Sequence, residues 1–196
     1  MNSSSFLRFL PLAVAIAFAC FPLVTRAATE PALLDDFSNA DKTLRGVGRI
    51  LVDDKAAGSQ SQATQKCVDG VLVVAGELVP GRGVPAFVSI PLLFTADNQP
   101  RDLSNYQGVR LRVKPGRGVV IVQVSTTDVT NFDYHAAPVA AKRGEFVEVR
   151  VPFKDMKRGW SEQTALNTKS VTSVNLVAFG MAREAFSYEV DEIGFY

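Results

Sequence analysis

The chain has few of the residues on which most catalytic and metal sites depend. Its 196 residues include one histidine, one tryptophan and two cysteines. A structural zinc ion needs four ligands drawn mainly from cysteine and histidine, so such a site is excluded. The sequence has no G-x-S-x-G segment, which excludes the serine nucleophile of the α/β hydrolases. We therefore predict no enzyme activity, no catalytic residue and no cofactor.

A large excess of charge of one sign is also missing. The chain has 21 Lys and Arg residues against 20 Asp and Glu residues, a net charge of +1. Binding to nucleic acid or to anionic lipid depends on an extended positive field, which this balance does not supply. Nucleic acid is therefore not a predicted partner.

The first residues have the composition of an export signal. Arg8 precedes an unbroken apolar run at residues 9–24, and small residues stand at Thr25 and Ala27, the two positions that a signal peptidase reads. The run contains Pro11 and Pro22 and is shorter than the ~20 residues of a membrane-spanning helix. We predict a signal peptide at residues 1–27 and a periplasmic or secreted protein with no integral membrane segment after cleavage.

Cleavage after Ala27 would leave residues 28–196, a length that suits one domain. Arg8 and Arg26 would leave with the signal and no acid would, so the net charge would change from +1 to −1. Cys20 would also leave, and Cys67 would have no partner for an internal disulfide. The stability of the domain must then come from the burial of apolar side chains.

No helical period longer than about two turns is present, and short β-branched runs separated by Gly, Pro, Asn and Asp dominate instead. In residues 108–114, Val109 and Leu111 alternate with Arg110 and Arg112, which is typical of a strand with one buried face. The VLVV and VVIV runs are apolar on both faces, which predicts central strands covered on both sides. The predicted strands are residues 33–37, 48–53, 70–78, 85–94, 108–114, 118–127, 131–137, 145–153, 170–180 and 186–196.

The tetrapeptide Pro-Gly-Arg-Gly occurs at residues 80–83 and 115–118. Proline at the second position of a turn and glycine at the third favour type II geometry. Neither copy leads into a predicted helix, as a phosphate-binding glycine loop does. Both copies are therefore predicted to connect strands.

The segment DLSNYQGVRLRVKPGRGVVIVQVST, residues 102–126, resembles the domain family of NADH:ubiquinone oxidoreductase complex I intermediate-associated protein 30. The resemblance includes an Asp-Leu-Ser, an aromatic-x-Gly, alternating strand residues and a glycine turn. It extends to LLDDFSNAD, DDKAAGSQSQ, VDGVLVVAGEL, FVEVRVPFKDM, SVNLVAFG and FSYEVDEIGFY, and so covers about residues 33–196.

The resemblance implies an all-β, galactose-binding-like jelly roll with two antiparallel sheets. Its best-known members assist the assembly of respiratory complex I, so it implies a protein-binding or assembly-factor role with a protein client. Many carbohydrate-binding modules share the architecture, and glycan binding is the alternative function. Fold alone does not decide between them.

The single histidine lies in NFDYHAA, residues 131–137. Period-two alternation puts Phe132 and Tyr134 on one face and Asp133 and His135 on the other. If the aromatic side chains pack in the core, Asp133 and His135 project outward, as a polar ligand contact or simply as exposed strand residues. Gln123 and Ser125 would line the same groove, where polar side chains beside Tyr134 can bind sugar hydroxyls.

Two further features are candidates for binding. Arg110, Arg112 and Lys114 form a basic row that would grip an acidic glycan or partner, or would form a charge ladder with Glu148 and Arg150. Trp160 stands in a predicted loop as a sugar-stacking platform, a protein contact or an internal plug. The predicted ligand-binding residues are Arg110, Arg112, Gln123, Asp133, Tyr134, His135 and Trp160.

No metal ligand is assigned, but one calcium arrangement stays open. If the first and last strands lie together, Asp35 and Asp36 would approach Asp191 and Glu192, whose carboxylate oxygens suit calcium. The sequence contains no D-x-D-x-D loop that would strengthen this interpretation.

Overall fold

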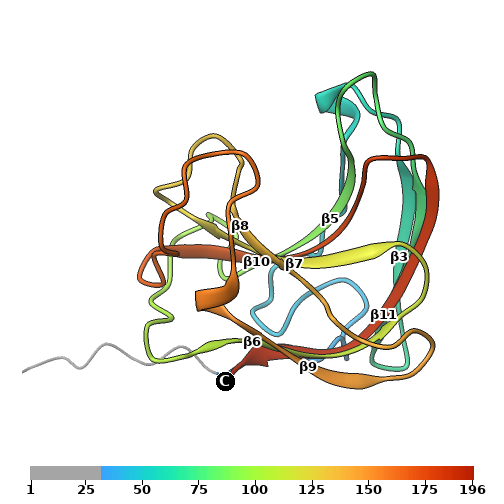
Figure 1. The fold of residues 1–196 in the computed structure, drawn as a ribbon. Coiled ribbons are helices and arrows are strands. Elements are labelled where there is room, and N and C mark those ends of the chain that lie inside the picture. The colour runs from blue at the N-terminus through green and yellow to red at the C-terminus, as the bar shows by residue number, and fades with distance from the viewer. Residues whose placement is uncertain (1–31) are drawn as a thin grey trace, which may run out of the picture.

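Residues 32–196, the part of the chain that the computed structural model describes, form two antiparallel sheets packed against each other (Figure 1). The first sheet contains β1 (Leu33–Asp35), β3 (Gln62–Val68), β4 (Val71–Leu78), β6 (Gly108–Pro115), β9 (Val147–Pro152) and β11 (Glu184–Phe195). The second contains β2 (Val52–Asp53), β5 (Ala86–Leu93), β7 (Val119–Thr126), β8 (His135–Pro138) and β10 (Val171–Gly180). Two short 3-10 helices, η1 (Lys55–Ala57) and η2 (Phe153–Asp155), lie in the connections.

The strand orders are β3-β4-β11-β6-β9, with β1 also pairing with β11, and β2-β5-β10-β7-β8. This architecture confirms the predicted all-β jelly-roll sandwich. Within residues 32–196, no helix is both long and apolar enough to span a bilayer. The predicted signal peptide lies outside the described residues.

Each of the ten predicted segments contains a strand, but β3 was missed by the sequence prediction. Its sequence, QATQKCV, has few apolar residues, and its inward side chains are only half-buried. Because β3 is an edge strand that pairs with β4 alone, it needs little apolar surface to be stable in the sheet. Segment 48–53 is a strand only at Val52–Asp53, and segment 131–137 only from His135.

The strand β11 organises the first sheet. It pairs along one edge with β4 and then with β1, and along the other edge with β6. The first and last strands therefore lie together, as the calcium hypothesis required, with Leu33 opposite Gly194.

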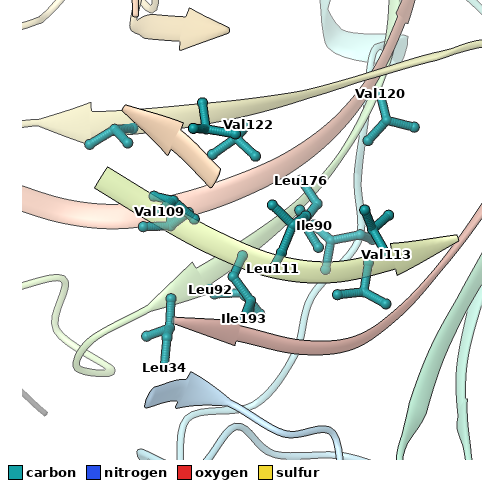
Figure 2. Packing of buried hydrophobic residues seen from close by; sticks show 14 of the residues in the cluster. Leu34, Ile90, Leu92, Val109, Leu111, Val113, Val120, Val122, Leu176 and Ile193 are labelled. Atoms are coloured by element: carbon teal, nitrogen blue, oxygen red, sulfur yellow. The ribbon is translucent and has the colours of Figure 1, made fainter. Parts of the chain in front are cut away.

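The core lies between the inner faces of the two sheets. Figure 2 shows Val109, Leu111 and Val113 of β6 packed against apolar side chains of the opposite sheet, among them Ile90, Leu92, Val122 and Leu176. All seven of these side chains are fully buried. Tyr188 of β11 is also buried, and its hydroxyl donates a hydrogen bond of 3.4 Å to the Leu176 carbonyl of β10. The apolar residues of the alternating strands are thus the ones that point toward the opposite sheet.

The strands with the VLVV and VVIV runs, β4 and β7, were predicted to be buried on both faces, but one face of each is less buried. β4 and β7 are interior strands of their sheets, but only one face of each is fully buried. On β7, Val120 and Val122 are in the core, whereas Val119 is 49% exposed and Ile121 is half-buried. The described residues do not cover the second face, so the apolar run overstates the burial of these strands.

The two Pro-Gly-Arg-Gly segments do connect strands, but the predicted turn position, with Pro80 second and Gly81 third, is wrong by two residues at the first copy. There the Val84 N–H donates to the Gly81 carbonyl, which places the turn at residues 81–84. The positive φ occurs at the last glycine of each copy, +76° at Gly83 and +72° at Gly118. Glycine tolerates this left-handed conformation because it has no Cβ.

The polar DDKAAGSQSQ segment joins the edges of the two sheets. The buried carboxylate of Asp54 accepts hydrogen bonds from the Ser61 N–H (3.0 Å), the Ser61 hydroxyl (2.6 Å) and the Phe87 N–H of β5 (2.9 Å). The Ser61 hydroxyl oxygen in turn accepts from the Val79 N–H at 3.0 Å. One side chain therefore fixes β5 relative to the chain that enters β3 and leaves β4.

We expect Asp54→Ala to lower the free energy of unfolding by at least about 2 kcal/mol, because each buried donor left without an acceptor costs about 1–3 kcal/mol. Urea denaturation at pH 7 measures the change. The matched control is Asp53→Ala, because Asp53 makes an exposed, solvent-screened ion pair with Lys55 and its removal should change the stability much less. Equal effects of the two substitutions would contradict this role for Asp54.

Candidate functional site

The outward face of β10 carries a connected set of polar side chains. Val174, Leu176 and Ala178 point into the core, so Ser173 and Asn175 lie on the opposite face. The neighbouring strand β7 places Gln123 opposite Asn175 and Ser125 opposite Ser173. We call Gln123, Ser125, Ser173 and Asn175 the polar strip.

Hydrogen bonds connect the members of the polar strip. The Asn175 amide donates to the Ser125 hydroxyl at 2.9 Å and to the Gln123 carbonyl oxygen at 3.4 Å, and Ser173 donates to Asn175 at 2.9 Å. Asn175 is only 4% exposed, whereas Gln123 is partly exposed. Asn175 therefore holds Gln123 in place, and Gln123 presents its remaining amide donors to the surface.

This outward face carries no charged side chain in the described strands. Its residues alternate with the core residues and pair across the sheet in register. They are Val52 of β2, Phe87, Ser89, Pro91 and Leu93 of β5, Ser173, Asn175, Val177 and Phe179 of β10, Val119, Ile121, Gln123 and Ser125 of β7, and Ala136 and Pro138 of β8. The face therefore offers hydrogen bonds and apolar contact, but no ion pair.

Aromatic side chains border this face beside β8. Tyr134 directly precedes β8 and, by alternation, lies on the same side as Ala136, which pairs with Gln123. The ring of Phe132 contacts Tyr134 edge-on, with centroids 6.4 Å apart and an interplanar angle of 87°. Phe132 is 75% exposed.

The predicted orientation of residues 132–135 is therefore wrong, although the alternation is real. Asp133 and His135 are buried, and Phe132 and Tyr134 face outward. The reason is that the inner side of this segment meets the loop at residues 157–168, which supplies polar backbone groups. Asp133 and His135 are anchors of that loop and not surface contacts.

Asp133 binds the loop through backbone amides. Its carboxylate accepts hydrogen bonds from the N–H groups of Gly159 (2.7 Å), Trp160 (3.0 Å) and Ser161 (2.6 Å). Burial acts to raise the pKa of Asp133, but hydrogen bonds from Ser161, Trp160 and Gly159 outweigh it and lower the pKa below its ordinary range. The carboxylate is therefore ionised at neutral pH and holds the loop as an anion.

His135 makes the second attachment. Its Nε2 donates to the Thr164 carbonyl at 2.8 Å, and the side chain is buried. Its Nδ1 is buried with no hydrogen-bond partner in the described part of the chain. A general acid or base must reach its substrate, and this imidazole is enclosed by its own loop.

Trp160 is displayed by the loop that Asp133 holds. Its side chain is 71% exposed, while its backbone N–H is bound to Asp133. The interpretation of Trp160 as an internal plug is therefore wrong. We call Phe132 and Trp160 the aromatic edge; Figure 1 shows the two loops that carry them side by side above β8.

Arg110 and Arg112 lie on the other sheet, on β6, away from the polar strip. Arg110 pairs with Glu192, Arg112 with Asp191, and Lys114 with Glu189 at 2.8 Å. The basic row therefore does form a ladder of ion pairs, but its acidic partners are on β11. Glu148 and Arg150 of β9, the partners suggested by the sequence, pair with each other. The basic row is neutralised and is not brought into the candidate site.

The same pairs occupy the carboxylates of the calcium hypothesis. Asp191 and Glu192 face arginines, and Asp35 forms a buried ion pair with Arg49 at 2.8 Å. Asp36 accepts hydrogen bonds from Ser38. Among residues 32–196, no group of three or more His, Cys, Asp or Glu side chains is arranged to hold a metal ion.

Two clefts lie away from the polar strip. One, of about 650 Å³, runs between the edges of β8 and β9 and is lined by alanine, valine and proline residues together with four charged side chains, Lys142, Glu148, Arg150 and Asp155. The other, of about 210 Å³, includes Cys67, a free thiol whose pKa is raised by burial. Burial opposes formation of the thiolate, so Cys67 is not an activated nucleophile.

The sequence comparison decides the family. Residues 36–190 match the family described as Complex I intermediate-associated protein 30 (CIA30). The chain belongs to the CIA30 family. The resemblance noted in the sequence is therefore confirmed, and both the polar strip and the aromatic edge lie within the CIA30 match.

Solved structures similar to this CIA30 domain include carbohydrate-binding modules. A family 11 module from Clostridium thermocellum, in complex with a beta-1,3-1,4-mixed-linked tetrasaccharide, aligns with a TM-score of 0.58 at 14% identity over 86% of this chain and 96% of the module. The family 11 module of the cellulosomal cellulase Lic26A-Cel5E of the same organism aligns with a TM-score of 0.57 at 13% identity, over 86% and 95% of the two chains. An agarase aligns with a TM-score of 0.53 at 10% identity over 83% of this chain and 24% of the agarase.

At these identities the structural matches establish the shared fold. Among curated proteins, none matches the chain by sequence. The similarity to the family 11 modules therefore concerns the backbone fold of the CIA30 domain.

Sequence reasoning found Gln123, Tyr134 and Trp160 of this site but missed Ser173, Asn175 and the exposure of Phe132. The alternation of polar and apolar residues in the segment 171–180 could have predicted Ser173 and Asn175. The segment VTSVNLVAFG places Ser173 and Asn175 at every second position, between apolar residues. No local pattern predicted the outward orientation of Phe132, because the loop that displaces it begins some 25 residues later in the chain, at Lys157–Gly159.

We expect acid to release the loop that Asp133 holds. Because the pKa of Asp133 is lower in the folded protein than in the unfolded chain, its ionisation stabilises the fold above about pH 4, and this contribution is lost as the pH falls through the folded-state pKa. Asp133→Asn should therefore cost about 1–3 kcal/mol at pH 7 and progressively less below pH 4. Denaturation between pH 7 and pH 2.5, followed by the fluorescence of the single tryptophan, measures the difference.

Asp155→Asn is the control for this pH series, because Asp155 is an exposed carboxyl close by in the sequence. Its effect should be small at every pH. A cost of Asp133→Asn that stays constant across the whole pH range would show that the Asp133 charge does not hold the loop.

Proposed function

We propose that this CIA30-family domain binds a neutral glycan on the outward face of the second sheet. The observation that carries the proposal is the uncharged polar strip with Gln123 partly exposed and Tyr134 beside it. A sugar ring offers hydroxyl groups for hydrogen bonds and an apolar C–H face for contact with aromatic rings. A site that combines oriented amides with a tyrosine matches both properties.

The uncharged surface favours a neutral ligand over an acidic one. An acidic glycan is recognised by Arg or Lys, usually through paired hydrogen bonds to carboxylate or sulfate. The outward strand positions of the second sheet hold neither residue, and Arg110 and Arg112 of the first sheet are bound to Glu192 and Asp191. We therefore propose that the arginines are structural and do not contribute to ligand binding.

The fold supports the same proposal. The family 11 module to which this domain is similar is described in complex with a beta-1,3-1,4-mixed-linked tetrasaccharide, and an agarase contains a similar region. A periplasmic or secreted location, as the predicted signal peptide implies, would bring the domain into contact with polysaccharide. The protein client implied by the family has no distinct surface among the described residues that favours it over a glycan.

We expect the wild-type protein to bind soluble beta-1,3-1,4-mixed-linked glucan in isothermal titration calorimetry. Gln123→Ala and Tyr134→Ala should each weaken binding by about tenfold, the loss expected for one hydrogen bond or one aromatic contact of ~1.4 kcal/mol. Arg112→Ala, on the other sheet, should change the affinity less than about twofold.

The same titration with agarose oligosaccharides, cellulose oligosaccharides and an acidic glycan tests the class of ligand. Binding to the acidic glycan alone would contradict a neutral ligand. An absence of binding to every glycan, together with specific capture of one protein when the mature chain is used as bait, would favour the assembly role instead.

A further inference from the structure

We infer that the aromatic edge, Phe132 and Trp160, is a second contact surface for the same ligand, so that the ligand is an extended polysaccharide chain and not a mono- or disaccharide. This inference rests on the proposed function. It follows from how the two rings are exposed, how firmly they are held and where they lie relative to the polar strip.

The exposure of both rings is unusual for this molecule. Phe132 is 75% and Trp160 is 71% exposed, whereas the other Phe and Tyr side chains within residues 32–196 are either buried, such as Tyr188 and Phe186, or half-buried. Large aromatic side chains on a rigid surface are enriched where proteins bind ligands or partners. The two residues stand on adjacent loops, since Asp133 next to Phe132 accepts a hydrogen bond from the Trp160 N–H, and Figure 1 shows these loops side by side above β8.

The loops that carry the rings are held by a dense set of hydrogen bonds. Besides the three amides bound by Asp133, Arg158 donates through Nε to the Asp133 carbonyl at 3.1 Å and through Nη2 to the Asn131 side chain at 2.9 Å. The Asn131 amide donates to the Ser161 hydroxyl at 2.9 Å. These contacts pre-organise the segments on both sides of the rings, which reduces the entropy lost when a ligand is bound.

The backbone of Phe132 also adopts a strained conformation in the state in which the side chain is exposed. Its φ is +63°, in the left-handed region that bulky residues rarely adopt. Such a conformation persists only where the surrounding contacts enforce it, and it is concentrated at ligand-binding and active sites. Here the neighbouring residues Asn131 and Asp133 are both bound to the loop at 158–161, which fixes Phe132 between them.

The position of the aromatic edge sets the length of the ligand. Adjacent strands are about 4.8 Å apart, so a chain lying across β10, β7 and β8 covers about 10 Å of the sheet before it reaches the edge strand β8. Trp160 lies beyond that point, since Lys157 bridges Ala136 of β8 and Trp160 follows three residues later, whereas Phe132 lies next to Tyr134. Only a chain of several sugar residues can contact the polar strip and Trp160 together.

The test is calorimetric titration with β-1,3-1,4-glucan oligosaccharides of two, four and six residues and with the polymer. For the wild-type protein, we expect the affinity to rise by about tenfold or more from the disaccharide to the hexasaccharide, the gain of one stacking contact. Trp160→Ala should remove most of this gain and leave the affinity for the disaccharide unchanged. Trp160 is the single tryptophan, so its fluorescence should respond to the long ligands and not to the short one.

Two control variants separate this inference from the proposed function. Gln123→Ala should weaken binding of the short and long ligands alike, and Trp160→Phe should retain most of the length dependence. If Gln123→Ala weakens binding but Trp160→Ala leaves the length dependence intact, the aromatic edge is not a contact surface and the glycan function stands. If the wild-type protein binds none of these ligands, nor the agarose and cellulose oligosaccharides, both are overturned. Melting temperatures confirm that the variants remain folded, as expected for side chains this exposed.

Discussion

The burial of the two inner sheet faces against each other is the constraint on which the rest of the structure depends. Successive residues of a strand point to opposite faces, so the choice of a buried residue also decides which residues face outward. On β10, Val174 and Leu176 enter the core, so the Asn175 side chain between them must lie on the outward face of the sheet. The candidate site is thus a direct consequence of the packing of the core, and it needs no separate structural element.

Polar side chains then extend this framework where the strands end. Asp54 joins the edge of β5 to the chain around β3 and β4, and Asp133 joins β8 to the loop that carries Trp160. In both cases a buried carboxylate accepts backbone N–H groups that would otherwise be left without partners. One arrangement stabilises the fold, and the other displays aromatic side chains on a rigid surface. The polar residues that would first be suspected of chemistry, including the single histidine, therefore have structural roles.

Family membership and fold similarity carry different information about this CIA30 domain. The family match covers residues 36–190. Several segments within it, such as the one around Asp54 and the alternating residues of β6, serve to form turns and strands. The similarity to family 11 carbohydrate-binding modules lies in the backbone architecture, at 14% identity. Neither comparison identifies the ligand. The argument for a glycan comes from the side chains on the outward face of the second sheet.

The sequence by itself determined the fold class, the family and ten of the eleven strands in the described part of the chain, because period-two burial is a local property of each strand. It did not predict β3, since an edge strand is stabilised by pairing with β4 more than by its own apolar residues. It also assigned the wrong faces to Asp133 and His135. Only the tertiary structure decided these orientations, because the groups that satisfy both side chains belong to residues 159–164, far along the chain. Alternation specifies that neighbouring side chains point to opposite sides, but which side is the interior depends on what the folded chain places there.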